Sequence, residues 1–395
     1  MKKMPNVSLD EVADLNPRLT EKLASSDEVS FVPMSAVSAE TADVTAEETR
    51  TYAEVAKGYT SFLTGDVLVA KITPCFENGK IAQAHLTKRV GFGSTEFHVV
   101  RPHAQKLDGR YTHHFLRLGS VRLAGERRMT GSGGQRRVPE NYLAKLEIPL
   151  PPLAEQRRIA EVLDRAEALR AKRRAALAQL DSLTQSLFLD LFGDPAANPK
   201  SFPEKPLDSL VRDDDTINYG VVQPGDDLDE GVPLVRVGDL IEGKVRHSDL
   251  KRIAPSIEAA YKRSRLRGDE ILVSCVGSIG VVVLADESVK GFNIARAVAR
   301  IPLAEATNRI FMAAYLSTDF VQRYFTNELR TVSQPTLNIK QISETIVVLP
   351  PIILQREFAR RVTAVEKLKT SHRASLAELD ALFASLQHRA FRGEL

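Results

Sequence analysis

The chain has 395 residues, more than one domain usually holds, and its 43% hydrophobic and 27% charged residues are typical of a globular protein. No apolar run reaches the ~18 residues that a membrane span needs, and the first residues lack a signal-peptide core, so we expect a cytoplasmic protein. Only two cysteines occur, Cys75 and Cys275, which excludes a disulfide framework and a zinc cluster. We expect both to be small buried residues at equivalent places in two similar halves.

Residues 1–149 form the first predicted globular region, in which short helices alternate with short strands. Ser8 is a typical N-cap residue, and Pro17 cannot continue a helix, so residues 8–16 are a helix candidate. β-Branched runs and a hairpin-type Asn-Gly turn predict the strands that follow. The expected elements are strands over 66–72, 81–86 and 91–102, a helix over 111–129 that ends near Gly125, a Gly/Ser-rich turn over 130–137, and a last strand.

Residues 150–194 form a predicted long helix that begins at a Pro-Pro pair, which fits a helix start but not its interior. Apolar residues recur every seven positions in two rows, as in a coiled-coil seam. The residues of this seam are Ile159, Val162, Leu169, Leu180, Leu183 and Leu187.

Residues 195–348 repeat the order of the first region, and residues 349–395 repeat the helix. At a constant offset of 199, residues 148–192 and 347–391 are identical at 18 of 45 positions, which indicates a duplication. The seam of the second helix consists of Phe358, Val365, Leu368, Leu379, Leu382 and Leu386.

A helix of about 38 residues is roughly 57 Å long and cannot bury its apolar stripe within one small domain. A single heptad stretch would favour a homodimeric coiled coil, but two matched copies in one chain favour an intramolecular pair. We therefore predict an α+β protein: two similar globular domains separated by two long antiparallel helices, with pseudo-twofold symmetry.

The net charge is only +3, but charge is unevenly distributed along each half. Residues 1–60 carry 6 basic and 11 acidic side chains, whereas residues 61–145 carry 14 basic and 6 acidic ones. The second half has the same polarity, and a single basic face is sufficient for contacts to DNA phosphates.

Side chains that fork onto base edges or bind phosphates are the candidate DNA contacts. In the first half they are Lys71, Asn78, Lys80, Arg89, Ser94, Thr95, Gln135, Arg136 and Arg137. In the second half they are Tyr219, Gln223, Arg236, Lys262, Arg263, Ser278, Asn293, Arg296, Gln334 and Thr336.

No catalytic constellation is found. A magnesium nuclease needs carboxylates and a lysine beside each other, and the Asp66/Lys71 pair has no lysine counterpart after Asp269. His113 and His114 are neighbours on a predicted helix, so they point in different directions and are expected to be ordinary helix residues and not metal ligands.

The stretches LPPLAEQRRIAEVLD (residues 150–164) and LPPIILQREFARRV (residues 349–362) resemble the helical regions of the specificity (S) subunits of type I restriction-modification enzymes. Residues 58–84, 92–102 and 217–240 are similar to target recognition domains of that family. The second copy departs from the pattern at Ile353-Leu354, where the first copy has Glu155 before the glutamine.

The resemblance implies a noncatalytic subunit whose two target recognition domains each read one half of a gapped DNA sequence. It implies two methyltransferase (M) subunits, which carry S-adenosylmethionine chemistry, and restriction (R) subunits, which use ATP and Mg²⁺; this chain would bind no cofactor itself. The alternative from another class is a coiled-coil scaffold with two protein-binding lobes and no role at DNA.

Overall fold

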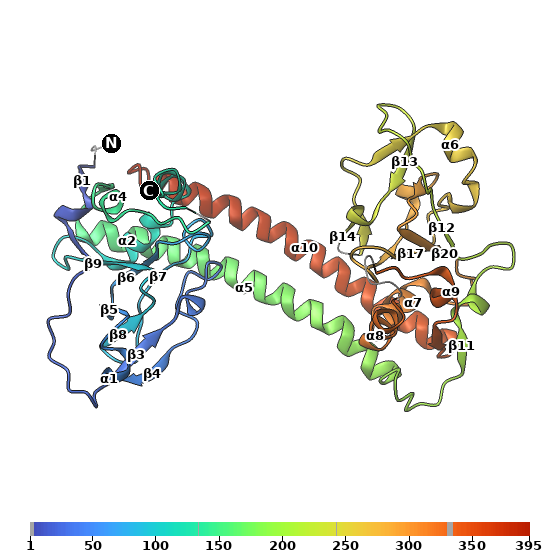
Figure 1. Ribbon diagram of the computed structural model, residues 1–395, viewed down its shortest axis with the longest axis horizontal. Coiled ribbons are helices and arrows are strands. Elements are labelled where there is room, and N and C mark those ends of the chain that lie inside the picture. The colour runs from blue at the N-terminus through green and yellow to red at the C-terminus, as the bar shows by residue number, and fades with distance from the viewer. Residues whose placement is uncertain (1–3, 133, 242, 330–334) are drawn as a thin grey trace. The chain divides into compact units, whose positions relative to one another are not determined.

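In the computed structural model, which describes residues 4–132, 134–241, 243–329 and 335–395, the chain divides into two compact units (Figure 1). Unit 1 consists of Met1–Ala175 with Arg373–Leu395, and unit 2 consists of Ala176–His372. Both contain short helices and small sheets, so the predicted α+β class is confirmed. Each unit holds part of both long helices, whereas the sequence places these helices in separate regions, 150–194 and 349–395. No helix among the described residues is long and apolar enough to cross a membrane.

Two four-stranded sheets form the body of unit 1. The first has the order β2 (Ala13–Leu15), β9 (Phe97–Pro102), β6 (Val67–Ala70), β7 (Ile81–Gln83). The second has the order β4 (Glu48–Thr51), β3 (Glu28–Val32), β8 (Val90–Gly93), β5 (Thr60–Leu63), in which only the β3–β8 pair is parallel. All four residues of β6 are buried because both faces of this central strand are covered. A separate pair joins β1 (Asn6–Ser8) to β10 (Glu147–Pro149).

The helices of unit 1 are α1 (Tyr52–Val55), α2 (Gly109–Leu116), α3 (Gly119–Glu126) and α4 (Glu140–Ala144). The single helix predicted over 111–129 is therefore wrong: it breaks at Arg117-Leu118, where Leu118 is extended and a glycine follows. The helix predicted over 8–16 is also wrong. Ser8 does cap a turn, but only the 3-10 turn Leu9–Glu11, after which the chain becomes β2 because it pairs with β9.

Unit 2 repeats most of this topology. Its main sheet has the order β12 (Asn218–Tyr219), β20 (Val298–Ile301), β17 (Ile271–Ser274), β18 (Val282–Leu284). Its second sheet has the order β16 (Lys251–Ile253), β13 (Val232–Val235), β19 (Asn293–Ile294), again with one parallel pair, β13–β19. Further pairs join β11 (Glu204–Pro206) to β21 (Ile346–Val348), and β14 (Leu240–Ile241) to β15 (Lys244–Val245). The helices are α6 (Pro255–Ala259), α7 (Arg309–Leu316), α8 (Asp319–Asn327) and α9 (Ile339–Ser343).

The two long helices are α5 (Leu153–Phe192) and α10 (Ile352–Ala390), each beginning just after its Pro-Pro pair. In unit 2, Asp181 of α5 forms an ion pair of 3.0 Å with Lys369 of α10, and Phe188 packs against Phe358. The position on α10 falls as the position on α5 rises, so the helices are antiparallel there. In unit 1, Arg170 binds Asp380 at 2.6 Å. The pairing of two helices from one chain is therefore confirmed.

The predicted seam is only partly correct. Ile159, Phe358 and Val365 are buried, and Val162, Leu180, Leu187, Leu379 and Leu386 are half-buried. The row of Leu169, Leu183, Leu368 and Leu382 is wrong, because these leucines are 39% to 52% exposed. The buried stripe of each long helix faces its own lobe as well as the other helix, which shifts it away from a two-helix heptad seam.

A buried glutamine attaches the start of each long helix to its lobe. The amide oxygen of Gln156 accepts a hydrogen bond from the backbone N–H of Asp108, the N-cap of α2, at 2.8 Å. Its amide nitrogen donates to the carbonyls of Lys106 and Pro151. Gln355 makes the equivalent bonds to Asn308, the N-cap of α7, and to Pro350. Leaving such buried groups unpaired costs about 1–3 kcal/mol each.

In unit 1, ion pairs add to the apolar contact between α2 and α5. Asp164 accepts hydrogen bonds from Nε2 of His114 at 2.7 Å and from the guanidinium of Arg110, and Arg117 binds Glu167 at 2.7 Å. Burial raises the pKa of Asp164, but the bonds from His114 and Arg110 outweigh burial and hold this pKa below its usual range.

Adjacent residues of α10 test which row lies in the core. Phe383 is 6% exposed and its ring lies under the guanidinium of Arg170, whereas Leu382 is 50% exposed. We expect Phe383→Ala to lower the free energy of unfolding by about 3–5 kcal/mol and Leu382→Ala to change it by less than about 0.5 kcal/mol. Urea denaturation of the whole chain measures both. A larger loss of unfolding free energy for Leu382→Ala than for Phe383→Ala would instead support the predicted heptad seam.

Acid should weaken unit 1 through Asp164. A carboxylate whose folded-state pKa is depressed contributes stability above its unfolded pKa, near 3.8, and loses it as the pH falls through the folded value. We therefore expect Asp164→Asn to destabilise the chain at pH 7, and the difference from the wild type to shrink below about pH 4. Thermal melts across this range check the effect; a difference that does not depend on pH would contradict it.

Candidate nucleic-acid interface

Three segments of unit 1 meet where the central strand β6 ends. The backbone N–H of Lys71 donates to the carbonyl of Glu96 at 2.8 Å, and that of Thr73 donates to the carbonyl of Arg136 at 2.9 Å. Val138 in turn donates to the carbonyl of Lys71 at 2.8 Å. These bonds bring together the turn after β6, the turn before β9 and the Gly/Ser-rich loop before α4, which are far apart in the sequence. We call this surface the first strand-end face; it carries Lys71, Asn78, Ser94, Thr95, Gln135, Arg136 and Arg137.

Carboxylates hold both arginines of the first strand-end face. Arg137 forms a fork with Glu96, with its Nη2 at 2.8 Å from Oε1, and Arg136 lies 3.1 Å from Glu77. The hydrogen bonds from Arg137 lower the pKa of Glu96. Both guanidinium groups remain more than 40% exposed, so each has a fixed direction and an accessible edge. Asn78, Thr95 and Gln135 beside them are exposed.

Two predicted contacts of the first half lie elsewhere. Lys80 donates its ammonium to the carbonyl of Met34 at 3.0 Å, so it serves to hold a loop. Arg89 is exposed and pairs with Glu21, but its carbonyl bonds to Thr64, just before the start of β6. Arg89 therefore lies at the opposite end of β6 from the first strand-end face.

The same construction recurs in unit 2 at the end of β17. Val276 pairs with Thr336, and the N–H of Leu337 donates to the carbonyl of Cys275 at 2.9 Å, as Val138 does to Lys71. Position 71 thus corresponds to Cys275 and not to a lysine.

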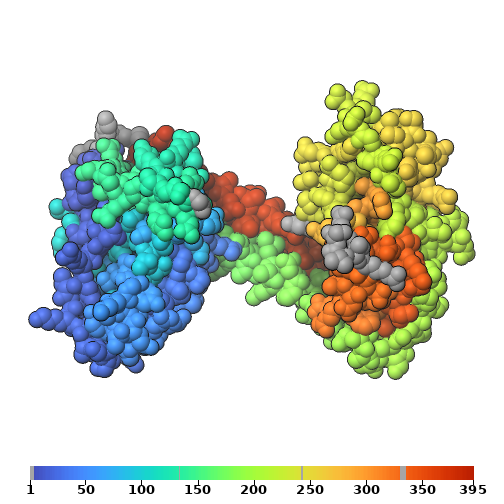
Figure 2. Space-filling view, in the orientation of Figure 1, coloured from blue at the N-terminus to red at the C-terminus, as the bar shows by residue number. Residues whose placement is uncertain are grey.

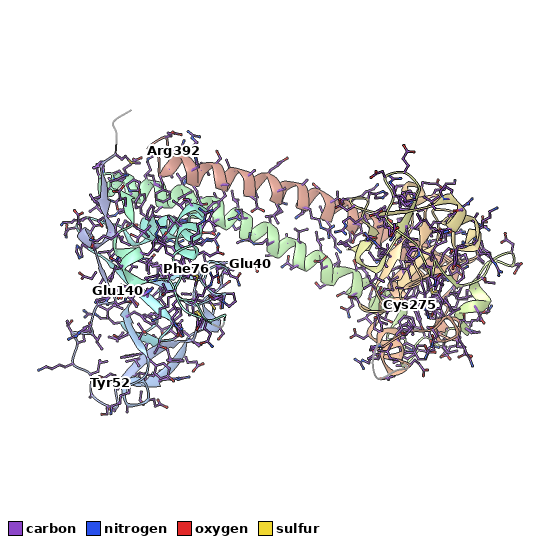
Figure 3. The ribbon with its side chains drawn as sticks, turned by 45° about the horizontal axis from the view of Figure 1, so that its top comes forward. Glu40, Tyr52, Phe76, Glu140, Cys275 and Arg392 are labelled. Carbon is purple, nitrogen blue, oxygen red and sulfur yellow. The ribbon has the colours of Figure 1, made fainter. Side chains whose placement is uncertain are left out.

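Cys275 (Figure 3) is buried, which raises its thiol pKa to about 12, whereas Cys75 lies in the turn and is half-buried. The two cysteines are therefore not at equivalent places, contrary to the expectation from the sequence.

A hollow of about 260 Å³ marks this second strand-end face, which we define by Tyr219, Val276, Arg296, Ala297, Thr336 and Asn338. Three predicted residues, Tyr219, Arg296 and Thr336, thus come together. The hydroxyl of Tyr219 donates to the carbonyl of Leu337 at 2.7 Å. A Cβ on Gly220 would lie 1.6 Å from the carbonyl oxygen of Ile294, so only glycine lets these two segments approach so closely. Gln334, the remaining prediction in this loop, lies outside the described residues.

The other predicted residues of the second half are dispersed. Lys262 and Arg263 are exposed beside a separate hollow of about 500 Å³, which Arg265, Arg267 and Asp213–Asp215 also line; the sequence prediction did not include Arg265 and Arg267. Gln223 and Ser278 are exposed, and Arg236 is bound to Asp239. Asn293 is fully buried and its amide bonds to Ser264 and Tyr261, so its predicted contact with DNA is wrong.

The described residues contain no cluster of His, Cys, Asp and Glu side chains that could hold a metal ion. Asp66 is buried against Arg101 at 2.7 Å and also accepts the N–H of Leu63. Asp66 directly precedes β6 as Glu270 directly precedes β17, so the two positions correspond. Glu270 accepts hydrogen bonds from three backbone N–H groups of its own turn. The histidine pair diverges as expected for a helix: His114 faces Asp164, and His113 lies 3.1 Å from the carbonyl of Ala42.

Comparison with known proteins identifies the family. A family model described as the type I restriction modification DNA specificity domain matches residues 1–179 and 212–381. The type I restriction enzyme EcoBI specificity subunit of Escherichia coli is 34% identical over 278 residues, which cover 63% of this chain and 58% of that protein. The EcoEI specificity subunit of the same species is 42% identical over 154 residues, 39% of this chain and 26% of that protein. The alignments thus span about a quarter to just over half of these relatives.

Solved structures agree on the fold. A type I restriction-modification system S subunit from M. genitalium has a TM-score of 0.59 at 17% identity, with 99% of this chain and 97% of that chain covered. A chain from a structural study of complex assembly in the type I R-M system has a TM-score of 0.62 at 19% identity, with 100% and 99% covered. Since the family model covers both halves and most of the sequence, this chain belongs to the family of type I restriction-modification DNA specificity subunits.

Proposed function

We propose that each unit reads one half of a two-part DNA sequence through its strand-end face, and that α5 and α10 set the number of unread base pairs between the halves. The repetition of one construction carries this proposal: in both units a loop before the short helix α4 or α9 pairs with the end of the central strand. Different side chains occupy equivalent positions, Arg137 in one face and Thr336 in the other. Two faces of one design with different side chains suit two different base sequences.

The same proposal covers partners and cofactors. The EcoBI and EcoEI relatives are subunits of type I restriction enzymes, and the family implies assembly with M subunits, expected to be two, and with R subunits. S-adenosylmethionine, ATP and Mg²⁺ would bind to those partners in the cytoplasm, and this chain would be noncatalytic. The exposed leucines of α5 and α10 are available to M subunits, and Ile353, 76% exposed, makes the start of α10 unlike that of α5.

Exchange of one lobe tests the two-reader proposal. We expect replacement of residues 200–346 by the corresponding segment of another family member to change one half of the methylated sequence and leave the other half intact. Methylome sequencing of cells that carry the complete system reads both halves at once. A change in both halves, or in neither, would contradict the proposal.

Matched arginines test the location of the first face. Arg136→Ala should weaken binding of the assembled methyltransferase to a duplex containing its methylated sequence and change the dependence of log K on log salt little, because Glu77 already supplies the guanidinium with a counter-charge. Arg89→Ala removes an equally charged, exposed side chain at the other end of β6 and should leave affinity nearly unchanged. Fluorescence anisotropy between about 50 and 200 mM salt measures both constants. Equal losses would mean that general charge, and not this face, binds the DNA.

A further inference from the structure

Each unit contains a groove at the same place in its fold, between the second helix of its helix pair and the last turns of a long helix. Groove 1 lies in unit 1, between α3 and the end of α10, with a volume of about 1010 Å³. Groove 2 lies in unit 2, between α8 and the end of α5, with a volume of about 830 Å³. Ala384 and Gln185, which are 199 positions apart, occupy the corresponding helix positions. Helices α3 (turquoise) and α8 (orange) lie at the surface in Figure 2. Both volumes are in the range of ligand-binding clefts.

The two grooves have opposite charge. Groove 1 is lined by Arg128, Lys145 and Arg392 against the single carboxylate Glu147, a net charge of +2 with His388 neutral. Groove 2 is lined by Arg323 against four carboxylates, a net charge of −3: Asp181, Asp194, Asp319 and Glu328. The two copies thus have a groove at the same place, but the grooves differ in the sign of their net charge.

Two of the three cations of groove 1 are available, and the third, Lys145, is paired with Asp10 at 2.8 Å. The guanidinium of Arg128 donates to the carbonyl of Ala124 at 2.9 Å and lies 5.3 Å from the ring of Tyr142, and no carboxylate in the described part of the chain pairs with it. Arg392, labelled in Figure 3, has no ion pair among the described residues and is exposed at the end of the chain. In groove 2, by contrast, the protein already supplies charge partners, because Asp181 binds Lys369 and Asp319 lies 4.0 Å from Arg323.

Part of the lining of groove 1 is apolar. Leu118 and Phe391 are half-buried there, and Phe115 and Val121 are buried. DNA phosphates would satisfy the arginines but would offer nothing to these side chains, whereas an amphipathic peptide helix offers both an apolar stripe and charged flanks. The N-terminus of α3 adds partial positive charge to groove 1, because its N-cap residue, Leu118, has no side-chain oxygen to accept a backbone N–H. At the equivalent place in unit 2, the side chain of Thr318 accepts a backbone N–H at the start of α8.

We propose that groove 1 is a docking site for an acidic amphipathic segment of a partner polypeptide, and that groove 2 rejects this segment. The inference rests on the proposed function only in that a partner subunit supplies the segment. The apolar stripe of the segment packs on Leu118 and Phe391, and its carboxylates pair with Arg128 and Arg392. The consequence is a fixed order of assembly: a partner with an acidic segment occupies unit 1 before any corresponding place on unit 2.

Two designed peptides test the charge preference. Each is a fluorescein-labelled helix of about 15 residues with leucines at i, i+3, i+4 and i+7, and they differ only in having Glu or Lys on the other faces. With the full chain, the acidic peptide should bind at least about tenfold more tightly than the basic one by anisotropy, and added salt should weaken its binding. Equal affinities would overturn the proposal, and so would displacement of the acidic peptide by duplex DNA.

Matched variants locate the site. Ala384→Trp fills groove 1 from an exposed position and should abolish binding of the acidic peptide, whereas Gln185→Trp fills groove 2 and should have no effect. The double substitution Arg128→Glu/Arg392→Glu should reverse the preference, so that the basic peptide binds better. Circular dichroism checks that each variant folds. If one does not, the single variant Arg392→Glu, at an exposed residue three positions before the last, is measured in its place. An effect of Gln185→Trp equal to that of Ala384→Trp would overturn the assignment. If the chain binds the peptide but the assembled methyltransferase does not bind its methylated sequence, the proposed function is contradicted and this inference stands.

Discussion

The attachment of each lobe to a long helix depends on one buried glutamine side chain. Gln156 and Gln355 accept a backbone N–H from the N-cap residue of α2 or α7 and donate to the carbonyl of the preceding Pro-Pro pair. One side-chain amide thus hydrogen-bonds the backbone at the start of the long helix and also the backbone at the start of the helix that packs on it. Because both helix starts are fixed together, the direction in which the long helix leaves the lobe follows from hydrogen bonding as well as from packing.

Beyond this shared attachment, the two copies have diverged in how the lobe contacts the helices. Unit 1 uses Asp164 between His114 and Arg110. Both units also pack aromatic rings at this contact: Phe391 lies against Tyr111 and Phe115 in unit 1, and Phe188 and Phe192 of α5 lie against Phe311 in unit 2. The ionic contact depends on pH and the aromatic contact does not, so acid acts first on unit 1.

The duplication, the α+β class and the starts of both long helices could be predicted from the sequence, because proline, heptad spacing and a repeat at a fixed offset are local patterns. The exposure of Leu169 and Leu382 could not be, since it depends on which face of the helix the lobe covers. In the candidate interface, Arg136, Arg137, Arg296 and Thr336 were predicted from residue type and loop composition. The structure places them at the strand ends, and their contact with DNA stays a prediction. The burial of Asn293 and the role of Lys80 depend on tertiary hydrogen bonds that leave no pattern in sequence.

The carboxylates beside the predicted readers limit what those readers can bind. Arg136 faces Glu77, Arg137 faces Glu96 and Arg236 faces Asp239. A guanidinium that already has a counter-charge gains little from an arbitrary phosphate, because the attraction to DNA is offset by repulsion between that phosphate and the carboxylate. A guanine edge, which is uncharged and accepts two parallel hydrogen bonds, does not suffer this repulsion. In the function we propose, the paired acids would suppress adhesion to random DNA more than they weaken recognition of the correct base, and would act as an electrostatic filter against the rest of the genome.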